Sequence, residues 1–247
     1  MTLVAVRRDY DRCTMASARS PNRVALFQAS ARAAHTPFAQ RSSTPGSIDG
    51  SHPHSTVPPT GSATLRPRPP LLPQRTPEGK ARGLSARETS MARSLFADAV
   101  DYRLPRVHNE KYLPFGLQPD DTAMTPNGEM YFSPTRFEED FSLTFAGSQW
   151  FMHEMVHVWQ YQLDYPVKLR GAFRIGLGYR YTLLADKRLR DYNMEAQGNL
   201  LADYWAVSQF ASPLALFEEK HRGDIALFRE VLTDFLANPS HKKNLPG

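Results

Sequence analysis

The chain has 247 residues, a mass of 27.9 kDa and a formal net charge of +5. This length suits one domain with an extension, and 41% apolar residues suffice for one hydrophobic core. The apolar runs are far shorter than the ~20 residues that a membrane-spanning helix needs, and the N-terminus lacks the charged-then-apolar order of a Sec signal peptide. The single cysteine, Cys13, excludes a disulfide framework and a cysteine-based metal site.

The charge separates a basic N-terminal part from the rest. Residues 1–90 carry 13 Lys or Arg and 5 Asp or Glu, whereas residues 91–247 carry 17 and 20. Residues 1–90 also hold 11 of the 20 prolines but only 3 of the 27 aromatic residues, too little apolar surface to offset the entropy lost on folding. We therefore expect a disordered basic extension rich in Pro, Ser and Arg over residues 1–84, and one folded domain over residues 85–247.

Such an extension is compatible with an organelle transit peptide, an arm that binds nucleic acid or a membrane surface, a secretion-related tail, or a flexible segment without a dedicated role. Its arginines are scattered without interleaved aromatic residues. We therefore do not infer nucleic-acid binding from the high pI.

The folded part is predicted to begin with a helix and a short β element. Ser85 and Glu88 have the spacing of a capping box, which predicts a helix over residues 86–100. Two strands are expected at residues 102–108 and 129–133, joined by a long loop. The second strand is our candidate for a sheet edge that pairs with an extended peptide.

The rest of the chain reads as mainly helical. Glycines interrupt residues 167–185, which we expect to be irregular or partly extended. Helices are predicted from residue 147 or 148 to 163, over 193–210, from a Ser212 cap with Pro213 at the first position, and over 224–236. The predicted fold class is α+β, mainly helical, with a short β element.

The central predicted helix contains an H-E-x-x-H motif at residues 153–157. His153 and His157, four residues apart, share one helix face at the separation that two ligands of one Zn²⁺ ion need. Glu154 would then take a proton from a metal-bound water that attacks a carbonyl. The three fixed positions alone could be a coincidence, but the apolar setting, without Pro or Gly from residue 148 to 165, favours a functional motif.

A third metal ligand is expected from the helix predicted over residues 193–210. Glu195 is our choice because a His-His-Glu set leaves the fourth zinc position open for water. Asp191 and Asp203 are its rivals, and Glu195 could instead be a first-turn glutamate favoured by the helix dipole. Small residues on the same helix, including Gly198, would allow a close approach to the metal helix.

Other candidate residues have supporting roles. Asp203 is turned by roughly 80° from Glu195 on an ideal helix, which suits a carboxylate that orients a ligating histidine, or an ordinary solvated or paired Asp. Tyr179, Tyr181 and His108 are candidate donors to the oxyanion, although aromatic residues of this kind usually belong to the core.

Several segments in order resemble the bacterial zinc-metallopeptidase domain of Vgr-related and Rhs-associated proteins. The resemblance spans roughly residues 95 to 240, and its motifs lie at 107–116, 125–128, 153–162, 191–197 and 202–204. It implies a small, single-domain, zincin-like fold with His153 and His157 as zinc ligands, Glu154 as general base and Glu195 as third ligand. In that family the domain belongs to type VI secretion spike proteins or is free-standing.

Together these features predict a zinc metallopeptidase, a hydrolase acting on a protein or peptide substrate. The resemblance implies a type VI secretion-associated effector with spike proteins as partners, held in the bacterial cytoplasm before export, without a Sec signal peptide. The alternative is a non-enzymatic, zinc-stabilised accessory module of a spike or tail assembly. A third interpretation has no metal.

Overall fold

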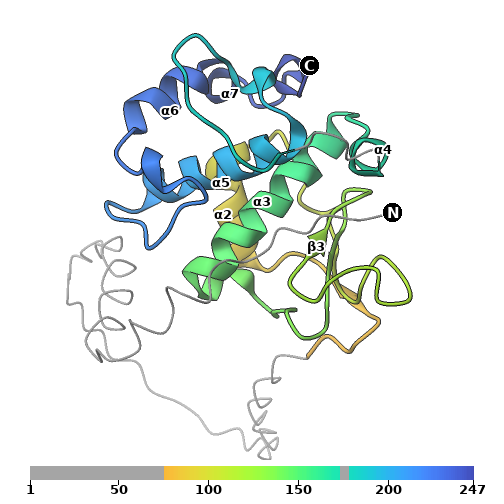
Figure 1. Ribbon diagram of the computed structural model, residues 1–247. Coiled ribbons are helices and arrows are strands. Elements are labelled where there is room, and N and C mark those ends of the chain that lie inside the picture. Colours follow the sequence, from red (N-terminus) through yellow and green to blue (C-terminus); the bar gives the residue numbers. More distant parts are fainter. Residues whose placement is uncertain (1–74, 173–177) are drawn as a thin grey trace, which may run out of the picture. The chain divides into compact units, whose positions relative to one another are not determined.

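The computed structural model of the chain describes residues 75–172 and 178–247, as ribbons in Figure 1. Most of the extension predicted at residues 1–84 lies outside the described residues. The fold nevertheless begins before Ser85, because residues 81 and 82 form a strand of the sheet. Among the described residues, no helix combines the length and apolar character needed to cross a membrane.

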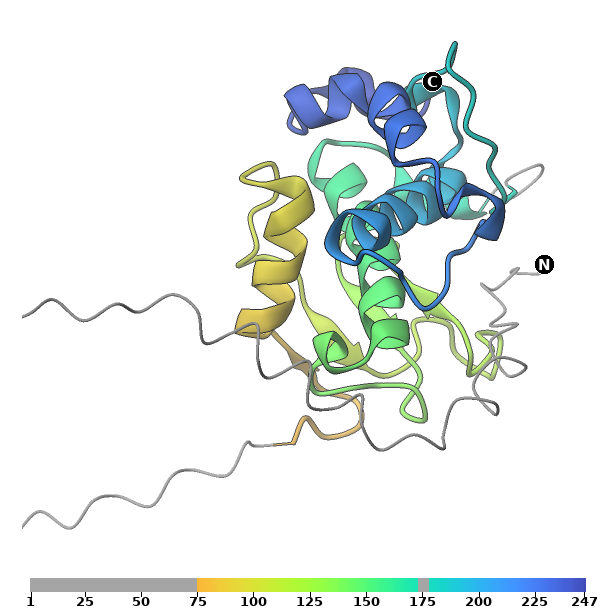
Figure 2. The same cartoon turned by 90° about the vertical axis from the view of Figure 1, so that its left-hand side faces the viewer.

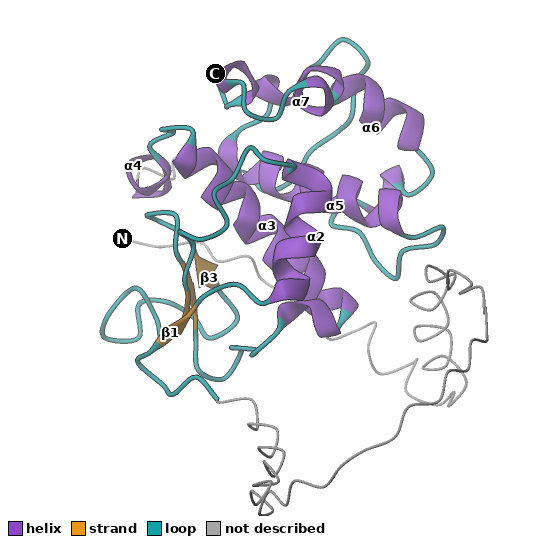
Figure 3. Ribbon diagram, turned by 180° about the vertical axis from the view of Figure 1, so that it is seen from behind, coloured by secondary structure: helices purple, strands orange, loops and turns teal. Residues whose placement is uncertain are grey.

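The structure is α+β and mainly helical, as predicted. Its helices form one part of the fold and its short sheet another (Figure 3). The helices are α2 (Ala86–Phe96), α3 (Phe145–Gln162), α4 (Val167–Ala172), α5 (Met194–Gln209), α6 (Ile225–Val231) and α7 (Thr233–Ala237). Single 3-10 turns are η3 (Phe141–Leu143), η4 (Leu189–Asp191), η5 (Glu219–His221) and η6 (Lys242–Asn244).

Helix α2 begins with the predicted capping box. The Ser85 hydroxyl accepts a hydrogen bond from the Glu88 N–H, and the Glu88 carboxylate accepts one from the Ser85 N–H. Glu88 is fully buried, and it also binds Arg82 and the backbone N–H of Phe141. The helix ends four residues earlier than predicted, because Ala97 adopts a positive φ of 49°.

The sheet has four short strands in the order β1-β2-β4-β3. They are β1 (Ala81–Arg82), β2 (Val107–Asn109), β3 (Ala123–Met124) and β4 (Met130–Phe132). Strands β2 and β4 are parallel, and the two outer pairs are antiparallel. The predicted strand over 129–133 is therefore interior, and β1 and β3 are the edges, which corrects our assignment of the edge strand.

The strand predicted over residues 102–108 is also shorter than expected. Its first residues form a turn in which the Asp101 carboxylate accepts a hydrogen bond from the Arg103 N–H and the Asp101 carbonyl accepts one from the Leu104 N–H. These side-chain and turn bonds compete with extended pairing. Only residues 107–109 join the sheet.

Helix α3 is the centre of the core. All of its residues from 147 to 160 are buried, and it packs most extensively against α5, with α2 on another side (Figure 2). The Thr144 side chain caps its N-terminus, three residues before the earliest start that we predicted. A helix buried all round must find internal partners for its polar side chains, and this requirement shapes the site below.

Three predictions for the C-terminal half are wrong. Residues 167–172 form α4 although the stretch was expected to be irregular. No helix starts at Pro213, because side chains such as Asp203 and Glu219 accept the backbone donors of residues 216–218. The predicted terminal helix is divided at Leu232, where the Thr233 hydroxyl donates to the carbonyls of residues 229 and 230 and competes with the helical ladder.

Candidate metal centre

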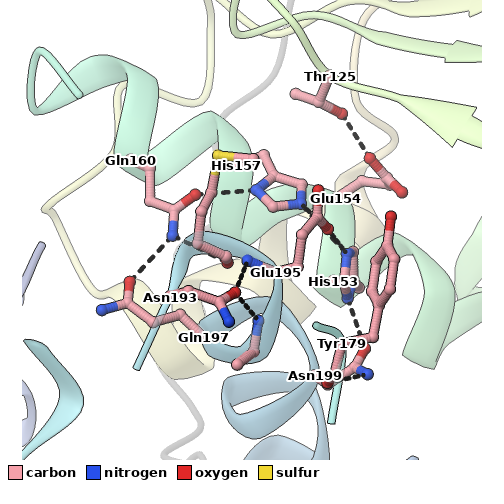
Figure 4. Close-up of polar contacts among 12 residues, drawn as sticks. Thr125, His153, Glu154, His157, Gln160, Tyr179, Asn193, Glu195, Gln197 and Asn199 are labelled. Atoms are coloured by element: carbon pink, nitrogen blue, oxygen red, sulfur yellow. Dashed lines mark hydrogen bonds and ion pairs between the residues drawn. The ribbon is translucent and has the colours of Figure 1, made fainter. Parts of the chain in front are cut away.

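Three side chains from two packed helices converge in the core (Figure 4). His153 and His157 lie on α3, Glu195 lies in the first turn of α5, and each is at most 5% exposed. The two Nε2 atoms are 3.2 Å apart. One Glu195 oxygen, Oε2, lies 3.4 Å from Nε2 of His153 and 3.3 Å from Nε2 of His157.

These three atoms form a nearly equilateral triangle that suits a metal ion. Ligand atoms ~2.0–2.1 Å from a tetrahedral zinc ion are about 3.3 Å apart, close to the separations observed here. Across residues 75–172 and 178–247, this is the one group of three His, Cys, Asp or Glu side chains with such geometry. The group could therefore hold a metal ion with three protein ligands.

The rival ligands lie elsewhere. Asp191 is exposed, and its carboxylate accepts a hydrogen bond from the Arg188 N–H. Asp203 is fully buried, but its carboxylate accepts hydrogen bonds from Tyr181, Gln149 and two backbone N–H groups of residues 217 and 218. Burial raises the pKa of Asp203 to about 6, although the hydrogen bonds from these donors act to lower it. Asp203 braces α3, α5 and two loops rather than orienting a histidine, contrary to the role that we expected.

Neutral amides orient both histidines. Nδ1 of His153 lies 2.8 Å from Oδ1 of Asn199, and Nδ1 of His157 lies 2.8 Å from Oε1 of Gln160. An amide oxygen can only accept, so each imidazole carries a proton on Nδ1 and turns Nε2 toward the triangle. This tautomer is the one that metal ligation through Nε2 requires.

The amide that holds His157 belongs to a longer buried chain. Nε2 of Gln160 donates to Oε1 of Gln197, and Nε2 of Gln197 donates to the carbonyls of Leu189 and Asn244. Asn199 and Gln197 were not singled out from the sequence. Their only signal in the sequence was their place within one turn of Glu195.

Helix α5 approaches the metal helix closely at Gly198. A Cβ atom built on Gly198 would lie 2.5 Å from Cε1 of His153. The Asn193 side chain caps the same helix by accepting hydrogen bonds from the Glu195 and Ala196 N–H groups. The cap fixes the first turn, and the glycine lets that turn carry Glu195 to the histidines.

Electrostatics couple the three groups in the metal-free state. Burial alone would lower the pKa of His157, but attraction to the Glu195 carboxylate and hydrogen bonding raise it to about 9. Burial would conversely raise the pKa of Glu195, but the two histidines hold it well below its usual range. The metal-free site therefore favours a proton shared between His157 and the Glu195 carboxylate. A metal cation can take the place of that proton.

Glu154 lies beside the triangle and has a different partner. It is 2% exposed, and its Oε2 accepts a hydrogen bond of 2.7 Å from the hydroxyl of Thr125, which is 5% exposed. Figure 4 shows this contact approaching from the sheet side, opposite α5. Thr125 was not among the site residues that we predicted, although it lies in one of the motifs that carry the resemblance.

The three candidate oxyanion donors lie in different surroundings. The Tyr179 ring is 6.2 Å from the His153 ring between centroids, and Figure 4 shows its hydroxyl on the Glu154 side of the site. The Tyr181 hydroxyl is buried and donates to Asp203. His108 is on β2, two strands from the edge strand β3, and is held between Glu110 and Glu129. Tyr179 is the one of the three beside the metal ligands.

Comparison with known proteins gives two relatives. Over 138 residues, 52% of this chain, it is 41% identical to the type VI secretion system spike protein VgrG2b of Pseudomonas aeruginosa, and the match covers 13% of that protein. It also resembles the solved effector domain of Pseudomonas aeruginosa VgrG2b, with 34% identity and a TM-score of 0.51, covering 65% of this chain and 86% of the domain. No model of a protein family matches the chain.

Proposed function

Because the chain belongs to the family of the VgrG2b effector domain, we propose that it is a type VI secretion effector that acts as a zinc-dependent metallopeptidase. The observation that carries the enzymatic part is the buried triangle of His153, His157 and Glu195 with Glu154 beside it. Three protein ligands are typical of catalytic zinc, whereas structural zinc usually has four. The ligand count therefore favours an enzyme over a zinc-stabilised accessory module.

In the proposed reaction the chain's residues hold zinc and move a proton. His153, His157 and Glu195 would hold the ion. As a Lewis acid, the ion would lower the pKa of a water molecule and polarise the substrate carbonyl. Glu154 takes the proton of the attacking water and passes it to the leaving nitrogen. Tyr179 is the residue that we propose as a donor to the developing oxyanion, because its ring lies next to His153.

The substrate is proposed to be an extended protein or peptide segment. Strand β3 is an edge of the sheet, and the next residue, Thr125, contacts Glu154. A peptide that pairs with this edge would acquire backbone hydrogen bonds and would lie next to the strand that leads into Thr125, the partner of Glu154.

The proposed route to the substrate is export. VgrG2b is itself a spike protein, and we propose that this chain associates with spike proteins in the bacterial cytoplasm and leaves with them. Immunodetection of the chain in the medium of bacteria with and without a working type VI machine tests this step. Equal amounts in the two media would contradict it.

The enzymatic proposal is tested by replacing the general base. Wild-type protein and Glu154→Gln are analysed for zinc content and for cleavage of an unfolded protein and a peptide library. We expect one zinc per chain in both and a loss of cleavage of at least about a hundredfold in the variant. Glu230→Gln, an exposed position on α6, is the matched control and should cleave like wild type.

The outcomes separate the alternatives. Undiminished cleavage by Glu154→Gln would refute the proposed mechanism. Stoichiometric zinc, unfolding by a chelator and no cleavage by the wild-type protein would instead favour the non-enzymatic module.

A further inference from the structure

The contact between Thr125 and Glu154 joins the sheet to the metal helix at the proposed catalytic carboxylate. The two residues are 29 positions apart, both are buried, and the hydroxyl-to-carboxylate distance is 2.7 Å. Thr125 follows the last residue of β3, so the edge strand determines where its hydroxyl lies.

A second contact holds the same turn against α3. Gly128 has a φ of 79°, and a Cβ atom built on it would lie 2.4 Å from Cδ1 of Tyr161. Tyr161 is seven residues after Glu154, about two helical turns, so both lie on the same side of α3. The turn from Thr125 to Gly128 therefore lies along this side of the helix and is held at both ends.

The hydrogen bond leaves the two oxygens of Glu154 in different states. Oε2 accepts the Thr125 hydroxyl, whereas Oε1 has no hydrogen-bond partner within the described part of the chain. A hydrogen bond to one oxygen of a buried carboxylate restrains the side chain and leaves the other oxygen available to accept a proton.

We propose that Thr125 is a positioning residue for Glu154: its hydroxyl fixes Oε2 so that Oε1 faces the attacking water. In the proposed reaction Oε1 takes one water proton, the water oxygen bonds to the carbonyl carbon, and the proton then passes to the nitrogen as the C–N bond breaks. Thr125 neither gains nor loses a proton. This inference rests on the proposed function and adds a residue to its machinery.

The test uses two substitutions in the full chain. Thr125→Val removes the hydroxyl and keeps the branched shape, whereas Thr125→Ser keeps the hydroxyl. We expect kcat to fall about tenfold to a hundredfold in Thr125→Val, with KM changed by less than about twofold, as for the loss of a hydrogen bond to a charged group. Thr125→Ser should restore kcat to within about threefold of wild type.

Two measurements distinguish positioning from general damage to the fold. Zinc affinity, measured by competition with a chromogenic chelator, should be unchanged in Thr125→Val, because the Thr125 hydroxyl bonds to Glu154, which is not one of the proposed ligands. In metal-free protein, a double-mutant cycle of unfolding with Thr125→Val and Glu154→Gln should give a non-zero coupling. Thr125→Ala replaces Thr125→Val if the valine variant does not fold.

Each contrary result has a clear meaning. Wild-type kcat in Thr125→Val, equal losses in the Val and Ser variants, or zero coupling would overturn the role of Thr125 while Glu154→Gln still shows the proposed function. Absence of cleavage by the wild-type protein would refute the proposed function itself, and the role of Thr125 with it.

Discussion

Gly198 lies against the imidazole of His153, with no room between them for a methyl group. A Cβ atom at this position would come within 2.5 Å of Cε1, 2.7 Å of Nδ1 and 2.9 Å of Nε2. The ring is also held by Asn199, the next residue of α5. One short piece of α5 thus determines both how near the helix comes and how the ring is turned.

The first prediction concerns this close approach. Gly198→Ala should weaken zinc binding by about tenfold to a hundredfold, because the methyl group must displace the His153 ring from the triangle. Chelator competition measures the affinity. Gly223→Ala is the matched control, since a Cβ there meets nothing within 4 Å. Equal zinc affinities in the two variants would show that α3 and α5 can move apart with little loss of free energy.

The second prediction concerns the amide that orients His153. Asn199→Ala removes the acceptor for the Nδ1 proton, so the ring can adopt the other tautomer, and zinc affinity should fall about tenfold to a hundredfold. Asn199→Asp supplies a stronger acceptor, makes the imidazole a better ligand, and should bind zinc at least as tightly as wild type. The prediction fails if both variants bind zinc like wild type.

The third prediction separates the candidate ligands. Glu195→Gln removes a ligand charge and should abolish stoichiometric zinc in the purified protein. Asp191→Asn, a few residues before Glu195 but exposed and bonded to Arg188, should keep one zinc per chain. Elemental analysis provides the measurement, and zinc loss in Asp191→Asn alone would reverse the assignment.

The fourth prediction concerns the pH dependence of the metal-free protein. The folded-state pKa of His157 is about 9, above the ordinary value of 6.5. Folding therefore favours the protonated form, so its stabilising contribution is full below pH 6.5 and is lost as the pH rises through about 9.

The melting temperature of the chelator-treated protein should accordingly fall between pH 6.5 and pH 9. Over the same range zinc affinity should rise, because the ion displaces this proton. In Glu195→Gln the fall should largely vanish, since the Glu195 carboxylate is the main group that raises the pKa. An equally steep fall in that variant would contradict the assignment.

The sequence could predict those features of the fold that depend on residues close to one another in the chain. The capping box of Ser85 and Glu88 and the helices around residues 153 and 195 follow from spacing and composition. The spacing of His153 and His157 also led to Glu195, because a zinc ion held by two histidines needs at least one further protein ligand. These features could be predicted from the sequence because their geometry is set within a few residues.

The remaining features depend on tertiary contacts. The role of Thr125 requires the strand order β1-β2-β4-β3, which short strands of two or three residues do not reveal. The loop after Pro213 has a good helix-start pattern, yet Asp203 takes its backbone donors from 14 or 15 residues away. The hydrogen bonds that the buried Asp203 carboxylate requires outweigh the local helix propensity of this loop.

The order of the strands also separates the start of the described chain from the candidate metal centre. The described chain enters the sheet through β1, whereas the candidate metal centre adjoins β3 at the other edge. With about 4.8 Å between neighbouring strands, the two edges are separated by about 14 Å. The described chain therefore enters the fold at the margin of the sheet that does not face Glu154, and this point of entry lies apart from the candidate metal centre.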